Sequence, residues 1–103
     1  MKAQKAGEEE LGRAIRNAVD LGRYVILPHA RQRYRERQVD DLDIEFVLEH
    51  GRRVKARDRY DSFLEAWSYC LEGQTLDERS LRIIVALLEH LGVVTVVVLE
   101  EKK

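Results

Sequence analysis

Two apolar runs near the end of the chain constrain its fold more than any other feature. They cover residues 81–88 and 93–99, contain many β-branched residues, and are separated by a short segment that ends in Gly92. Such side chains favour strands, and a run that is apolar at nearly every position is typical of a strand buried on both faces. We therefore expect two central strands, which the short connection makes antiparallel neighbours.

The residues just before these runs predict two more strands. Residues 65–71 alternate large and small side chains, as on a strand with two different faces. Residues 73–78 form the expected turn after it. Residues 52–58 are polar and strongly basic, which predicts an exposed edge strand whose charges discourage pairing with other chains. The short turns together favour an antiparallel meander of about four strands.

The first half of the chain has helical patterns. Apolar residues recur at helical spacing up to Gly22, which is a suitable helix stop. Asp40 and Asp43 have the spacing of a capping box, and Gly51 is placed to end that helix in the left-handed conformation. The expected elements are helices at 8–22, 28–37 and 40–51, with a short β-like segment at 24–27.

The order of elements predicts an α+β fold. Two to three N-terminal helices pack on one face of a curled, mostly antiparallel sheet of about four strands. The 103 residues, of which 45% are hydrophobic and 36% charged, suffice for one domain with a modest core. We expect a flexible leader at residues 1–7 and a single α+β domain at 8–103.

Composition narrows the classes of function. A single cysteine, Cys70, excludes an internal disulfide and a zinc cluster of thiolates, and the three histidines are scattered without ligand spacing. We therefore expect neither a metal nor a cofactor. The N-terminus lacks an apolar signal core, and no apolar stretch is long enough to span a bilayer, so a cytoplasmic location without a membrane partner is expected.

The formal net charge of −1 hides an uneven distribution. Residues 31–37 and 52–59 contain nine of the eighteen basic residues, whereas residues 61–101 contain eight acidic residues and only Arg79 and Arg82. A basic middle and an acidic far half indicate either an anion-binding surface or simply a solvated surface with patchy charge.

Three residues in the first basic segment share one helix face. At about 100° per residue, His29, Arg33 and Arg37 lie within roughly 80° of each other. One group that titrates near neutrality and two planar cations suit a phosphate or a carboxylate. The alternative is structural: His29 hydrogen-bonds the backbone at a helix start, and the arginines pair with nearby acidic residues.

Several motifs together resemble one protein family, the bacterial domain of unknown function 4258. The resemblance covers roughly residues 23–99 and includes His29-Ala-x-x-Arg33-x-x-x-Arg37, the helix end at 47–51, Trp67-Ser-Tyr69, Glu72-Gly73, Leu81-Arg82-Ile-Ile-Val85 and Val-Val-Thr95-Val. That family is similar in architecture to the RelE-like toxins of toxin–antitoxin systems, including the MqsR type. The resemblance implies a small α+β protein and, as a candidate activity, metal-independent cleavage of messenger RNA that a bound antitoxin blocks.

Metal-free cleavage of RNA needs a proton acceptor for the 2′-hydroxyl, cations for the phosphate and a proton donor for the leaving oxygen. The residues that supply these groups here are His29, Arg33, Arg37, Tyr69 and Arg82. The sequence does not establish that they converge, because the sheet faces of Tyr69 and Arg82 are undetermined. The alternative is a non-catalytic binding module, in which the same basic surface holds a protein partner or a nucleic acid.

The second basic segment offers another binding surface. In a strand, alternating residues share a face, which here carries Arg53, Lys55, Arg57 and Arg59. Such a row can follow a phosphate backbone, bind an acidic antitoxin segment, or only protect an edge strand from aggregation. The expected partners are therefore RNA or the ribosome and a cognate antitoxin, and the apolar C-terminal strand also allows a homodimer.

Overall fold

The computed structural model describes residues 4–100 and has the expected α+β fold. The three α-helices lie in the first half of the chain, with the short strand β1 between the first two. Five further strands follow, and all six strands form one mixed sheet. The elements are α1 (Glu8–Leu21), β1 (Tyr24–Ile26), α2 (Pro28–Arg37), α3 (Asp41–His50), β2 (Arg52–Arg53), the 3₁₀ helix η1 (Lys55–Arg57), β3 (Arg59–Asp61), β4 (Ala66–Gln74), β5 (Ser80–Leu87) and β6 (Leu91–Glu100). None of the helices within residues 4–100 is both long and apolar enough to cross a membrane.

The predicted antiparallel meander is confirmed in β4, β5 and β6. Leu71 lies opposite Ile83, and Ile83 lies opposite Val96. The strand order is β1-β6-β5-β4-β2, with β3 also paired to β4. The prediction of about four strands was too low by two. It missed β1, which runs parallel to β6 with Tyr24 opposite Leu91, and it gave one strand where the structure has β2 and β3.

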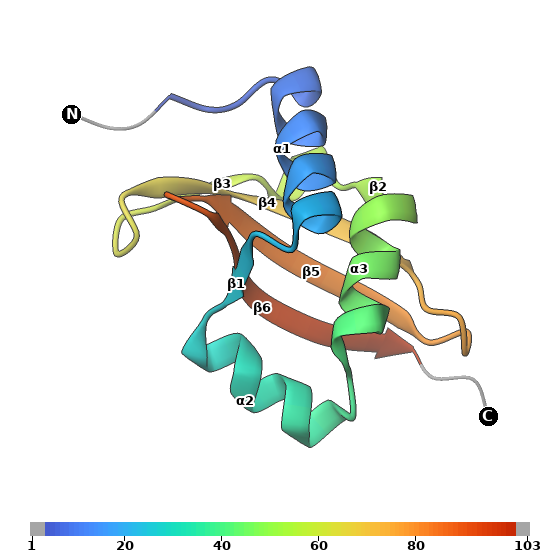
Figure 1. Ribbon diagram of the computed structural model, residues 1–103. Coiled ribbons are helices and arrows are strands. Elements are labelled where there is room, and N and C mark those ends of the chain that lie inside the picture. The colour runs from blue at the N-terminus through green and yellow to red at the C-terminus, as the bar shows by residue number, and fades with distance from the viewer. Residues whose placement is uncertain (1–3, 101–103) are drawn as a thin grey trace.

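The helices lie on one side of the sheet (Figure 1). Helices α1 and α3 cross one face, and α2 packs against β6 beside β1. The core between α3 and the sheet contains Val47, Tyr69, Leu81, Ile83 and Val85, all buried. Since side chains alternate along a strand, the strand residues between these core residues point to the opposite face. A hollow on that face is lined by residues outside α1, α2 and α3, and we call this side the helix-free face.

Capping decides where two of the helices begin and end. Asp40 accepts a hydrogen bond from the Asp43 nitrogen, and Asp43 accepts one from the Asp40 nitrogen, so the predicted capping box is confirmed. Gly22 ends α1 with φ of 64°, as expected. A guanidinium that the sequence did not reveal holds the α2–α3 connection: Arg79 donates to the carbonyls of Arg37 and Gln38 and to the Asp43 carboxylate.

Gly51 ends α3 for a different reason from the one predicted. Its φ is −72°, which any residue adopts, so the expected left-handed stop is wrong. A Cβ at this position would lie 2.5 Å from the carbonyl oxygen of Val47 and 2.9 Å from that of Glu72. Gly51 is therefore required because the end of α3 approaches the backbone of β4 closely.

The end of the predicted leader packs against the domain. Ala6 is buried, and its backbone nitrogen donates to the Tyr69 hydroxyl at 2.8 Å. Lys5 lies 3.0 Å from the Asp58 carboxylate. Lys5 and Ala6, which belong to the predicted leader, therefore contact the domain, while residues 1–3 lie outside the described part of the chain.

The two kinds of glycine give opposite responses to alanine. Gly51→Ala should lower the free energy of unfolding by about 1–3 kcal/mol, the usual cost of overpacking. Gly12→Ala should raise it by about 0.5–1 kcal/mol, because Gly12 lies inside α1 and its added Cβ meets nothing within 4 Å. Urea denaturation measures both, and equal responses would contradict the close approach at Gly51.

Candidate functional site

The first predicted cluster, His29, Arg33 and Arg37, lies on α2, and none of its residues lines the hollow beside that helix. His29 and Arg37 are exposed, and the partly exposed Arg33 lies 3.5 Å from Glu36 on the same helix. A shallow hollow beside α2 is lined instead by the neighbouring arginines Arg31 and Arg35. The three residues form an exposed basic face, and no other predicted catalytic residue reaches it.

Tyr69 and Arg82 lie on opposite faces of the sheet. Tyr69 is 2% exposed, pairs with Val85, and accepts the hydrogen bond from Ala6 on the helix side. Arg82 pairs with Glu72 in the register and lines a hollow on the other side. The predicted catalytic set is therefore divided among α2, the core and the helix-free face, and the structure does not bring it together.

The basic segment 52–59 is not the predicted strand. After the two residues of β2, the 3₁₀ turn η1 breaks the alternation that would have placed its cations on one face. Arg53 turns inward to Asp58 at 2.5 Å, and Lys55 extends to Glu8 of α1 at 3.2 Å. Only Arg57 and Arg59 of the predicted row line the helix-free face.

Arg53 and Asp58 form a buried ion pair that shapes this turn. Their side chains are 14% and 1% exposed, and Lys5 approaches the same carboxylate. The Arg53 guanidinium also lies over the Tyr69 ring, 5.3 Å from its centre. Because Nε and Nη1 of Arg53 and Oδ1 of Asp58 are buried without a hydrogen-bond partner, the pair depends strongly on its mutual contact.

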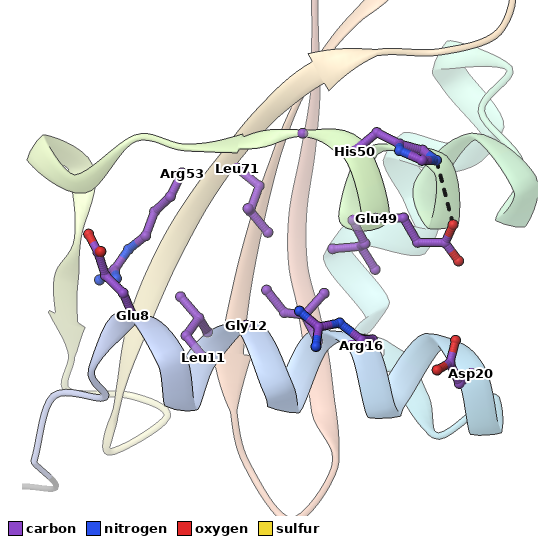
Figure 2. A pocket seen from close by; sticks show the side chains of 12 residues that line it. Glu8, Leu11, Gly12, Arg16, Asp20, Glu49, His50, Arg53 and Leu71 are labelled. Carbon is purple, nitrogen blue, oxygen red and sulfur yellow. Dashed lines mark ion pairs between the residues drawn. The ribbon is translucent and has the colours of Figure 1, made fainter.

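Arg53 also borders a groove between α1 and the end of α3 (Figure 2). The groove has a volume of about 670 Å³. Figure 2 shows Arg53 and Glu8 at one end, with Leu11 and Leu71 beside them, and Glu49, His50 and Asp20 at the other end. The charges on its rim are mixed in sign, so the groove has no preference for an anion or a cation.

A second hollow collects three of the predicted cations from different elements. It has a volume of about 650 Å³ and lies on the helix-free face. We call it the sheet-face depression. Arg57 of η1, Arg59 of β3 and Arg82 of β5 line it, together with the polar residues Asp61, Ser68 and Thr95 and four apolar side chains.

The depression has an excess of positive charge. Within residues 4–100, Arg57 and Arg59 are exposed and have no carboxylate at ion-pairing distance. Arg82 donates from Nε to Glu72 at 2.8 Å. Asp61 uses its Oδ1 to accept two backbone hydrogen bonds of the following turn. Two unpaired guanidinium groups and a third with donors to spare suit a phosphate.

Cys70 lies on the same face as Arg82 but is fully buried. Burial raises the pKa of its thiol, and Glu72 raises it further, while Arg82 and Arg57 lower it in part. At neutral pH the thiol is therefore protonated and has little nucleophilic character. The depression is suited to binding an anion and not to covalent catalysis by cysteine.

Three further residues of the depression had not been singled out from the sequence. Asp61, Ser68 and Thr95 are polar residues at positions whose face is set only by strand pairing. The position of Ser68 could have been predicted in part, because neighbouring residues of a strand face opposite sides and Ser68 must therefore face away from Tyr69. Thr95 stands in a motif of the family resemblance, but the sequence does not show which face it occupies, because a β-bulge lies between Ile84 and Val85 on the neighbouring strand.

The buried and exposed ion pairs of this segment should differ in strength. Asp58→Ala leaves Arg53 buried without its partner, so we expect the free energy of unfolding to fall by about 3–5 kcal/mol. Glu8→Ala removes the exposed pair with Lys55 and should cost at most about 1 kcal/mol. Thermal and urea unfolding of both variants measure the difference, and similar losses would show that Asp58 is not a structural anchor.

Comparison with known proteins supplies one match. A search of curated proteins and a search of solved structures found none. The model of a family described as "Domain of unknown function (DUF4258)" matches residues 26–98, which include the arginines of the sheet-face depression and the basic face of α2. Since the match covers more than half of the chain, this protein belongs to the DUF4258 family.

Proposed function

We propose that this protein binds single-stranded RNA along the helix-free face of its sheet. The observation that carries the proposal is the convergence of Arg57, Arg59 and Arg82 in one depression, two of them without an acidic partner among the described residues. Guanidinium groups form two parallel hydrogen bonds with phosphate oxygens. Successive phosphates of one strand would then lie against cations from three neighbouring elements.

The surroundings favour a flexible single strand over a duplex. The arginines line a hollow in a sheet, whereas the major groove of a double helix is entered by a protruding α-helix or two-stranded β-ribbon. The hydroxyl groups of Ser68 and Thr95 lie in the same hollow, and hydroxyls are suitable partners for ribose 2′-hydroxyls. The resemblance to RelE-like toxins supports RNA as the nucleic acid.

A second function, metal-independent cleavage of the bound RNA, is favoured by the pairing of Arg82 with Glu72. In the proposed step, Glu72 takes the 2′-hydroxyl proton and the 2′-oxygen attacks the phosphorus. The bond from phosphorus to the 5′-oxygen breaks, and that oxygen takes a proton from water. The hydroxide that is left takes the proton held by Glu72, and a 2′,3′-cyclic phosphate remains. Arg82 stabilises the negative charge of the pentacovalent state. Glu72 borders the depression through its hydrogen bond with Arg82, whereas His29 lies on α2 and Tyr69 is buried on the helix side, so neither has a part in this scheme.

Partners follow from the same surface. An acidic segment of a cognate antitoxin would compete with RNA for the unpaired arginines, and a ribosome would present RNA to them. These partners, like the homodimer through residues 93–99, stay predictions. In the described residues, β6 is bordered by β1 over three residues and packed by α2.

RNA binding can be assigned to one of the two basic surfaces by single substitutions. Fluorescence anisotropy with a labelled, unstructured 12-nucleotide RNA should show that Arg57→Ala, Arg59→Ala and Arg82→Ala each weaken binding about tenfold. Each loss of a phosphate contact should also reduce the salt-dependence slope by about 0.7. Arg33→Ala and Arg37→Ala on α2 carry the same charge change and should bind like the wild type.

The opposite pattern would place the nucleic-acid surface on α2. If the α2 variants lose affinity and Arg82→Ala does not, the sheet-face proposal is wrong.

Cleavage has a separate test in the presence of EDTA. Labelled RNA, free or on ribosomes, should yield fragments ending in a cyclic phosphate. At saturating RNA, Arg82→Ala and Glu72→Gln should slow their formation about 100-fold or more, because Glu72 is the proposed base and Arg82 stabilises the charge of the pentacovalent state besides binding phosphate. Glu36→Gln, which neutralises a carboxylate on α2, is the control. If the wild type leaves all these RNAs intact and its expression does not arrest growth, cleavage is abandoned and binding alone remains.

A further inference from the structure

Phe63 is the most exposed large apolar side chain among residues 4–100. It is 93% exposed and lies in the turn of residues 62–65 that joins β3 to β4. An aromatic ring in water gains nothing for the stability of the fold, since its apolar area is not removed from solvent. The ring therefore has no role in packing within the domain, and it is accessible to a ligand.

The turn holds Phe63 in a defined place beside the sheet-face depression. Oδ1 of Asp61 accepts hydrogen bonds from the backbone nitrogens of Phe63 at 2.9 Å and Leu64 at 3.0 Å. Glu65 then closes the turn with φ of 54°. Asp61 itself lines the depression, and two residues of chain span at most about 7 Å. The Asp61 carboxylate, which borders the phosphate-binding hollow, thus also holds the backbone of Phe63 in place.

We propose that Phe63 is a stacking platform for a base of the RNA strand whose phosphates lie in the sheet-face depression. The inference rests on the proposed function and deepens it by specifying a strand with unpaired bases. Single-strand binders combine a basic path for the backbone with exposed aromatic rings, because every base has a face that stacks. Here Arg59 and Phe63 would supply both from one hairpin.

The surroundings of the ring favour a base over a protein partner. A protein that docks on an exposed ring usually covers further apolar surface around it. In this turn Ser62 and Glu65 are polar and exposed, and Leu64 is partly buried. The other strongly exposed large apolar residues lie on different elements, at Leu21, Leu42 and Leu76. A lone ring among polar residues suits a base better than a protein interface.

Two nucleic-acid ligands of equal charge distinguish base stacking from phosphate binding. One is an unstructured 12-nucleotide RNA, and the other is an abasic strand with the same number of phosphates. Phe63→Ala should weaken binding of the RNA about five- to 150-fold, the range expected for one stacked base, with an unchanged salt slope. Binding of the abasic strand should be unchanged within about twofold, and Phe63→Trp should retain RNA binding.

Controls keep the inference separate from the function on which it rests. Leu76→Ala removes a similarly exposed side chain from another turn and should change neither affinity, and thermal unfolding verifies the fold of each variant. If the wild type binds RNA and Phe63→Ala binds it equally well, or if both strands weaken together, Phe63 is not a stacking platform while the proposed function stands. If the wild type binds neither strand, the proposed function fails and the inference falls with it.

Discussion

The register of the β4–β5–β6 meander determines what the other parts of this protein can do. It directs Tyr69, Leu71 and Ile83 towards α3 and Cys70 and Arg82 towards the opposite face. Because the apolar side is covered by helices and the other side is not, one sheet supplies both the core and an accessible surface. A slip of one residue would exchange the two sets and expose the core.

The short turn between β2 and β3 adds charge to that surface without adding a long loop. A continued strand would have alternated Arg53, Lys55, Arg57 and Arg59 along one edge. Instead, the pairing of Arg53 with Leu71 directs Arg53 to the helix side, and the 3₁₀ turn that follows leaves Arg57 and Arg59 beside Arg82. The buried Asp58 holds the turn from within, so a carboxylate that never faces the ligand decides where two cations lie. The resulting positive excess is local, in a chain whose formal net charge is −1.

Much of the fold was predictable from local signals. The capping box at Asp40 and Asp43, the stop at Gly22 and the β-branched runs each act within a few residues, and the structure contains all of them. The parallel pairing of β1 with β6 was not predictable in this way, because its partners are separated by most of the chain. The candidate site was predicted only in part. Arg57, Arg59 and Arg82 were named, but in two different sets. Their common face depends on strand register, and the uniformly apolar runs of β5 and β6 do not show which side chains face the helices and which face the other side of the sheet.

The parallel pair of β1 and β6 has a consequence for how the chain is made. Residues 24–26 meet residues 91–93, so the contact encloses α2, α3 and four of the six strands. On a ribosome, β1 emerges long before its partner, and it stays unpaired until nearly all of the domain has been translated. Closing so long a loop carries an entropic cost that the late strand must offset, which makes the folding of this domain dependent on contacts distant in sequence. Residues that complete the sheet are thus among the last to be synthesised, and the arginine-lined hollow can form only when Val94 and Thr95 have joined β5.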